Sequence, residues 1–160
     1  MTRPIVQSAI FPASPAKLFA IYTDSARHSA ATGAQASVSA QAGAKFTAFD
    51  GMLEGRNLLV VPGRMIVQAW RAAHWKKSDL DSILTLTFSR APSTGRIDLV
   101  HVGVPAHDHR GITQGWPKYY WQPWRAYLKA YRRPRSERGG MFGMDCLAGV
   151  EAALRRHVAR

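Results

Sequence analysis

Hydrophobic and polar residues alternate with a period of two through the middle of the chain, and this pattern predicts antiparallel β-strands. The alternation is cleanest over residues 82–90, where Leu84, Leu86 and Phe88 share one face. Turn signals such as Asp50-Gly51 separate neighbouring segments. The predicted strands are residues 4–11, 34–40, 44–49, 56–61, 64–71, 82–90 and 96–104.

The segment between the first two predicted strands has a helical period instead. Ser14 is placed to cap a helix, and Pro15 suits its first position, where a missing N–H costs nothing. Thr23 or Asp24 is a suitable cap for a second helix, which Gly33 would end. We therefore expect two short helices after the first strand.

The helical period returns after Pro105 in a segment that is unusually rich in aromatic residues. Apolar side chains recur there at alternating spacings of three and one, which predicts one long amphipathic helix. Pro123 lies inside this helix, so we expect a bend where its hydrogen bond is lost. The predicted apolar stripe consists of Trp116, Tyr119, Tyr120, Pro123, Trp124, Tyr127, Leu128 and Tyr131.

This order of elements predicts an α+β domain over residues 1–131. An antiparallel sheet must bury one face, and the long aromatic helix is the only sizeable element available to cover it. Where a curved sheet wraps a helix, the space between them often becomes a cavity. Residues 132–160 are expected to form a basic linker and an amphipathic helix from Asp145 to Val158 that extends the domain.

Composition adds a strong positive charge to this picture. The chain of 160 residues has a formal net charge of +12, which favours anionic partners. Cys146 is the single cysteine, which excludes an internal disulfide and fits a reducing compartment. No apolar run is long enough for a membrane span, and no signal peptide is evident near the N-terminus. We therefore expect a cytoplasmic protein.

Four segments in order give a resemblance to a known family: "FPASPAKLFAIYTDSARHSAATGAQASVS", "FDGMLEGRNLLVVPGRMIVQAWR", "HVGVP" and "GWPKYYWQPWRAYL". The chain resembles the START-like, or SRPBCC, superfamily and, within it, the family named for the activator of the heat-shock protein 90 ATPase. The resemblance implies a helix-grip fold, in which a seven-stranded curved antiparallel sheet wraps a long C-terminal helix.

The same resemblance implies less about function. Members of the superfamily include chaperone activators, lipid carriers and polyketide cyclases. The eukaryotic chaperone activator has an additional N-terminal domain, and we expect no segment here to correspond to it, because Ile5 already begins the expected helix-grip domain. We therefore rank chaperone activation below ligand binding.

The preferred hypothesis is non-catalytic binding of a small apolar or amphipathic ligand between the sheet and the long helix. Aromatic side chains at helical spacing also commonly pack as core, and the same face would supply both roles. His101 is either a satisfied core histidine or a polar group inside the cavity. The expected ligand contacts are Trp70, Phe88, Leu99, His101, Trp116, Tyr120 and Trp124.

Other chemistries find less support in the sequence. No nucleophile, paired acids or phosphate-binding glycine loop is evident, so we expect no catalytic residue and no cofactor. His107 and His109 flank an aspartate, but they fall in a predicted loop, and we expect no metal site. A cyclase-type enzyme would need a buried group with a shifted pKa, for which the sequence offers only His101.

The partners of the chain are constrained by where its charges lie. The basic residues Lys118, Arg125 and Lys129 lie on the helix face opposite the aromatic rings, whereas a nucleic-acid platform needs rings and charges together. We therefore expect no specific nucleic acid. The alternative to a small ligand is an acidic protein partner, such as a chaperone, that meets the basic helix face. The chain is expected to be a monomer or a homodimer.

Overall fold

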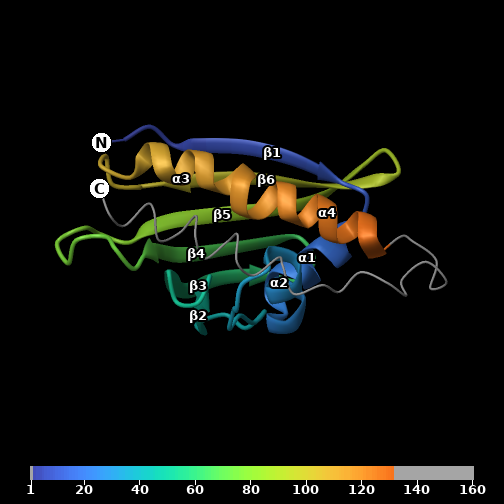
Figure 1. Ribbon diagram of the computed structural model, residues 1–160, viewed down its shortest axis with the longest axis horizontal. Helices are drawn as coiled ribbons and strands as arrows, with labels where there is room; N and C mark the ends of the chain where they lie inside the picture. The colour runs from blue at the N-terminus through green and yellow to red at the C-terminus, as the bar shows by residue number, and fades with distance from the viewer. Residues whose placement is uncertain (1, 132–160) are drawn as a thin grey trace.

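A computed structural model describes residues 2–131 of the chain, so the predictions for residues 132–160 lie outside the described part. The elements are β1 (Ile5–Phe11), α1 (Pro15–Thr23), α2 (Ser25–Thr32), β2 (Lys45–Ala48), β3 (Leu53–Val61), β4 (Met65–Ala72), β5 (Ser82–Ala91), β6 (Thr94–Val102), α3 (His109–Gly115), η1 (Trp116–Trp121) and α4 (Gln122–Tyr131). The described residues contain six strands and two helical layers, the first made of α1 and α2 and the second of α3, η1 and α4 (Figure 1).

The strands form one antiparallel sheet in the order β1-β6-β5-β4-β3-β2. Strand β5 alternates between buried and half-buried residues along almost its whole length, as its sequence predicted. Leu84 on this strand is in register with His101 of β6 and with Gln68 of β4, and all three are buried. One face of the sheet therefore supplies the core, and the residues that alternate with these buried ones point to the other face.

The expectation of seven strands is wrong for the described residues, which contain six. Residues 34–40, predicted as a strand, make only the isolated bridge between Ser37 and Thr47. The hydroxyl of Ser25 bonds both backbone groups of Val38, accepting from its N–H at 2.9 Å and donating to its carbonyl at 3.0 Å. A helix side chain therefore satisfies backbone groups that a neighbouring strand would otherwise have paired.

The two short helices have the caps that their sequence favours. Ser14 accepts a hydrogen bond from the N–H of Lys17 at 3.2 Å, and Asp24 accepts one from the N–H of Arg27 at 2.9 Å. Gly33 ends α2 with φ of 77°, a left-handed conformation that glycine adopts without strain. These caps fix where the chain turns from β1 towards the sheet edge at β2.

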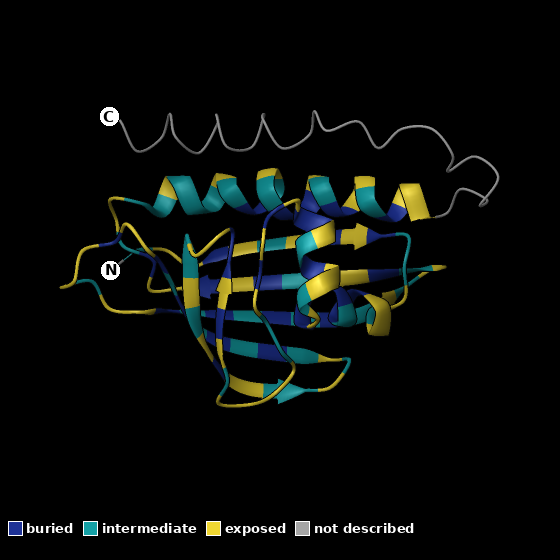
Figure 2. Ribbon diagram, turned by 60° about the horizontal axis from the view of Figure 1, so that its bottom comes forward, coloured by how far each residue is buried: buried dark blue, intermediate teal, exposed yellow. Residues whose placement is uncertain are grey.

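The second helical layer crosses the sheet beside β1 and in front of β6 and β5 (Figure 1), and its sheet-facing side is buried (Figure 2). It begins at His109, earlier than the sequence predicted, because α3 precedes the aromatic segment. Its central turn, η1, is a π-helix, in which the N–H of Gln122 bonds the carbonyl of Pro117. Pro123, predicted to bend the helix, is the second residue of α4, directly after this wider turn.

The wider π turn changes which aromatic residues face the sheet. A strict period of 3.6 leaves Trp121 off the predicted apolar stripe, yet Trp121 is buried together with Trp116 and Tyr120. Its Nε1 donates to Oε1 of Gln7 on β1 at 2.9 Å, which ties the helix to the sheet border. A π turn inserted into an α-helix shifts the register of every later side chain.

A chain of buried polar side chains connects the sheet to the short helices. The hydroxyl of Tyr22 on α1 donates to Oε1 of Gln68 at 2.7 Å, and Nε2 of Gln68 donates to Oδ1 of Asn57 at 2.8 Å. Burial raises the pKa of Tyr22, so the hydroxyl keeps its proton and remains a donor.

None of the described helices has the length and apolarity that crossing a membrane requires.

Candidate functional site

A partly open cavity of about 400 Å³ lies between the second helical layer and the β3–β4 side of the sheet. Its walls come from three places in the sequence: the turn between β2 and β3, the end of β4, and the helical segment from α3 to η1. Its apolar surface is much larger than its polar surface. The apolar lining residues are Phe49, Met52, Leu53, Trp70, Ala72, Ile112, Trp116, Tyr119 and Tyr120.

Three of the seven residues predicted as ligand contacts line this cavity: Trp70, Trp116 and Tyr120. The ring centroids of Trp116 and Tyr120 are 4.7 Å apart, and those of Trp70 and Trp116 are 6.4 Å apart. Trp70 reaches the cavity because it lies on the inward face of β4, along which buried and half-buried residues alternate. The structure therefore brings these three rings, from a strand and a helix, together on one wall.

The other four predicted contacts are buried in the packed interior and are not part of the cavity lining. Phe88 packs edge-on against Phe19 of α1, with 5.5 Å between ring centroids. Trp124 is fully buried against Phe11, with centroids 5.9 Å apart. Leu99 has no exposed surface. Trp124 therefore packs α4 against β1, and Phe88 packs α1 against β5.

The fourth of these, His101, is a member of a buried series of hydrogen bonds that runs from the backbone of Trp70 to the side chain of Trp116. The hydroxyl of Ser82 donates to the carbonyl of Trp70 at 2.7 Å, so it accepts from Nε2–H of His101, also at 2.7 Å. Nδ1 of His101 then accepts from Nε1–H of Trp116 at 3.3 Å. Burial lowers the pKa of His101 to about 3, so the ring is neutral and orients the Trp116 indole.

The turn before β3 contributes a wall residue that the sequence did not suggest. Phe49 has φ of 52°, a left-handed conformation that is costly for a bulky side chain. Its ring packs edge-on against Tyr120, with 5.2 Å between centroids, and this burial opposes the backbone cost. The Asp50-Gly51 signal predicted a solvent-exposed hairpin turn, so the inward position of Phe49 was missed.

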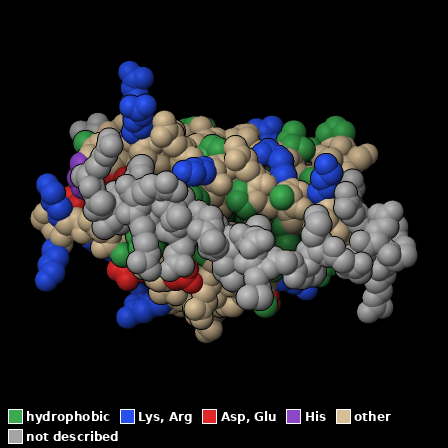
Figure 3. Space-filling view, in the orientation of Figure 1, with side chains coloured by type: hydrophobic (Ala, Val, Ile, Leu, Met, Phe, Trp, Pro, Cys, Tyr) green, Lys and Arg blue, Asp and Glu red, His purple; other side chains and the backbone are tan. Residues whose placement is uncertain are grey.

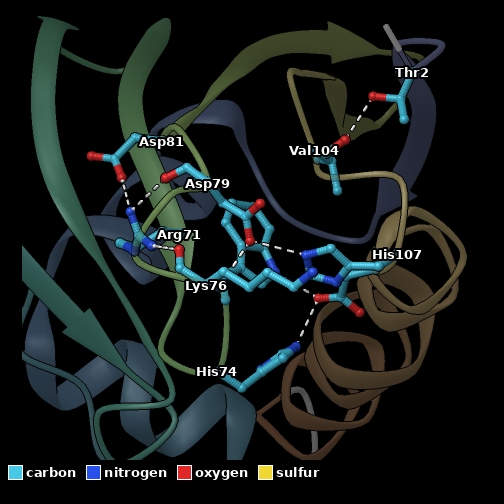
Figure 4. A network of polar contacts seen from close by, with 10 residues as sticks. Thr2, Arg71, His74, Lys76, Asp79, Asp81, Val104 and His107 are labelled. Atoms are coloured by element: carbon cyan, nitrogen blue, oxygen red, sulfur yellow. Dashed lines mark hydrogen bonds and ion pairs between the residues drawn. The ribbon is translucent and has the colours of Figure 1, made fainter.

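Two histidine–aspartate pairs join the loops at one end of the molecule, beside the cavity (Figure 4). Nε2 of His74 lies 3.0 Å from Oδ2 of Asp108, and Nε2 of His107 lies 2.9 Å from Oδ2 of Asp79. The hydrogen bond from His107 holds the pKa of Asp79 below its usual value. Both pairs connect the loop after β4 with the segment that leads into α3.

Asp108 anchors the start of α3 through side chains rather than through a cap of its own helix. Its Oδ2 accepts from Nε1–H of Trp75 at 2.7 Å as well as pairing with His74. Gly111 leaves room for this arrangement, because a Cβ there would lie 2.6 Å from Oδ1 of Asp108. His74 and Asp108 line the cavity rim, so these contacts position one side of its opening.

Several titratable side chains around the cavity are engaged by partners within the protein. The carboxylate on the rim, Asp108, is occupied by His74 and Trp75, and His101 is screened from the cavity by Trp116. His107 and His109 turn to different partners, Asp79 and the carbonyl of Arg3. Within residues 2–131, no three histidine, cysteine or acidic side chains gather as a metal site would require.

Cationic side chains occupy the outer side of the second helical layer. Lys118, Arg125 and Lys129 are all exposed, as the helix pattern predicted. Figure 3 shows lysine and arginine side chains projecting from several places on the face of the molecule that carries these helices. Lys118 also lies on the cavity rim, with its Nζ 5.1 Å from the ring centroid of Tyr119.

Comparisons with known proteins agree with this architecture. The activator of 90 kDa heat shock protein ATPase homolog 1 of Homo sapiens is 31% identical over 121 residues, which are 76% of this chain and 36% of the human protein. The homolog from Dictyostelium discoideum is 29% identical over 110 residues, which are 68% of this chain and 28% of that protein. The chain therefore spans about a third of the length of the curated relatives it matches.

Solved structures share the fold. The crystal structure of an HSP90 activator from Plasmodium falciparum has a TM-score of 0.71 at 22% identity, covering 80% of this chain and 97% of that one. The solution structure of the Aha1 dimer from Colwellia psychrerythraea has a TM-score of 0.68 at 12% identity, covering 82% of this chain and 100% of that one. The sequence profile described as "Activator of Hsp90 ATPase homolog 1-like protein" matches residues 12–129. The chain belongs to this family of Hsp90 ATPase activator homologues.

Proposed function

We propose that the protein is a non-catalytic binding module whose cavity takes a small apolar or amphipathic molecule. The observation that carries this proposal is the partly open cavity of about 400 Å³, walled by aromatic rings. Small-molecule sites are typically apolar clefts of roughly 300–1,000 Å³ with a few polar groups. The exposed or half-buried polar side chains of the lining, His74, Asp108, Gln114 and Lys118, form its rim, and Nε1–H of Trp70 is a buried donor without a partner among the described residues.

This distribution of groups favours an elongated or amphipathic ligand. The apolar part would enter against the lining side chains Trp70, Trp116 and Ile112, where burial of apolar surface supplies the binding energy. A polar head would remain at the rim, where hydrogen bonds exchange with water at small net cost. No bond needs to be made or broken for this role.

Filling the cavity tests the proposal. Ile112 is half-buried on the cavity wall, so Ile112→Trp is expected to occupy the space a ligand needs and to weaken binding of a fluorescent fatty-acid probe at least ~10-fold. Leu80→Trp is the matched control, because Leu80 is 84% exposed and outside the cavity lining. Equal affinities for both variants in a fluorescence titration, or no probe binding by the unaltered protein, would contradict the proposal.

A second candidate function is contact with an Hsp90-type chaperone. It is supported by the relatives, which are described as activators of the 90 kDa heat shock protein ATPase, and by the exposed cations of α4. In this case the basic outer face of the helical layer would meet an acidic surface of the chaperone. Such a contact would not require the cavity.

Charge reversal separates this candidate from the first. Arg125→Glu combined with Lys129→Glu is expected to weaken binding to purified Hsp90 at least ~10-fold at low salt, since it reverses two cations of the contact surface. Raising the salt concentration should have the same effect on the unaltered protein, because exposed charges are screened. The measurement is biolayer interferometry at two ionic strengths. Ile112→Trp is the control and should bind as the unaltered protein does; loss of binding only in Ile112→Trp would contradict the charge-based contact.

A further inference from the structure

Within residues 2–131, strand β1 is an edge strand of the sheet, with no strand paired on its outer side. It is the terminal strand in the sheet order, and all seven of its residues pair with β6 on one side. In Figure 1 it runs along the upper border of the molecule. Among the described residues, no backbone hydrogen bond reaches residues 5–10 of this strand from its other side. The alternate N–H and C=O groups that point away from β6 are therefore available for another strand.

The outer face of this border is apolar and exposed. Val6 is 69% exposed and Ile10 is 52% exposed, whereas Val100, which is in register with Val6 on the next strand, is 40% exposed. Val6 is more exposed because it has a strand neighbour on only one side. Proteins usually protect such borders with charged side chains or proline, and the β1 sequence IVQSAIF contains neither.

We propose that a second copy of this chain pairs with β1, antiparallel, about a two-fold axis at Ser8. Placing Ser8 opposite Ser8 of the second copy pairs residues 5–11 with residues 11–5 and uses the whole strand. This register sets Val6 against Ile10 of the other copy on the outer face, twice by symmetry. Moving the axis by one residue leaves Ile10 without an apolar partner, so the self-complementary pattern selects Ser8.

The charges near this axis permit two copies to approach. Arg96 and Asp98 on β6 form an ion pair of 2.7 Å within one copy, and Ser8 hydrogen-bonds to both. The two Asp98 residues would be separated by three strand spacings, about 14 Å. The centre of this edge, around the proposed axis, is therefore neutral on a chain with a formal net charge of +12. Higher salt should strengthen this dimer by screening overall repulsion, the opposite of its effect on a contact with an acidic partner.

The size of the contact predicts a reversible dimer. A ladder of seven residue pairs is about 23 Å long. Pairing along one strand buries less than the roughly 1,200 Å² of a standard stable complex, so we expect a dissociation constant on the order of 10–100 µM.

Sedimentation velocity of the full chain from 1 µM to several hundred µM measures this association. Val6→Lys combined with Ile10→Lys should shift the midpoint at least ~10-fold, since it places cations against apolar partners. Leu80→Lys is the control, because Leu80 is exposed but lies outside β1. A chain that stays monomeric throughout, or a dimer that the double variant leaves unchanged, would overturn the proposal.

Cysteine crosslinking tests the register itself, in a Cys146→Ser background. Directly opposed Cα atoms lie about 4.5–5.5 Å apart, within disulfide reach. Ser8→Cys should therefore crosslink to itself under mild oxidation. Val6→Cys and Ile10→Cys should not crosslink alone, but a mixture of the two should. Self-crosslinking of Val6→Cys with none for Ser8→Cys would show a different interface.

Discussion

Replacing Trp124 with alanine is expected to lower the free energy of unfolding by about 3–5 kcal/mol, the largest effect of a single substitution that we predict. Trp124 has no exposed surface, and its ring contacts Phe11, Tyr22 and Tyr120 at centroid distances of 5.9 to 6.3 Å. Alanine would leave a large space between α4 and the sheet, which the surrounding rings cannot fill without moving. Urea unfolding followed by far-ultraviolet circular dichroism measures the difference.

Two further substitutions make this prediction specific. Trp124→Phe is expected to cost much less than Trp124→Ala, because it keeps a ring and removes the indole N–H, which has no hydrogen-bond partner among the described residues. Lys129→Ala, on the exposed side of the same helix, should change the stability by less than about 0.5 kcal/mol. If all three variants lost the same stability, α4 would not be packed through Trp124.

Acidification is expected to destabilise the protein by about 2 kcal/mol between pH 6.5 and pH 4.5 through His101 alone. Burial lowers the pKa of His101 from 6.5 to about 3 in the folded state. The unfolded chain therefore binds a proton below pH 6.5 that the folded protein rejects, so stability falls as the pH decreases from 6.5 towards 3. Burial also lowers the pKa of His28, which adds to the loss in the same direction.

A variant that cannot take up this proton tests the origin of the effect. His101→Gln offers an amide N–H to Ser82 and an amide oxygen to Trp116, so it can replace both hydrogen bonds without titrating. Urea unfolding at the two pH values should show about 2 kcal/mol less loss for His101→Gln than for the unaltered protein. Equal losses in both proteins would mean that His101 binds its proton equally well in the folded and unfolded states.

Local sequence patterns predicted helices and strands best where the structure of a segment depends only on residues close to it in sequence or on burial of one of its faces. Strand β5 alternates cleanly because one of its faces meets the core and the other does not. The helix caps at Ser14 and Asp24 depend on hydrogen bonds three residues away, which sequence spacing specifies directly. Residues 34–40 failed as a predicted strand because Ser25, distant in sequence, bonds Val38 instead.

The candidate site was predictable only in part. Trp70 was expected as a ligand contact, and the helical spacing placed Trp116 and Tyr120 inward; all three line the cavity. The same reasoning selected Trp124 as a ligand contact, but Trp124 is buried against Phe11 and does not line the cavity. Periodicity indicates which side of an element faces the interior, but it does not indicate where the interior leaves a space.

The sequence by itself determined the family, the order of most strands and helices, and the inward position of Trp116, Tyr120 and Trp124, because these follow from local spacing and from motifs in order along the chain. Only the tertiary structure decided the cavity, whose walls join Phe49, Trp70 and Ile112 from separate elements. It also decided the π turn that brings Trp121 inward. Both depend on how side chains far apart in sequence fill one volume, and no period along the chain records that fit.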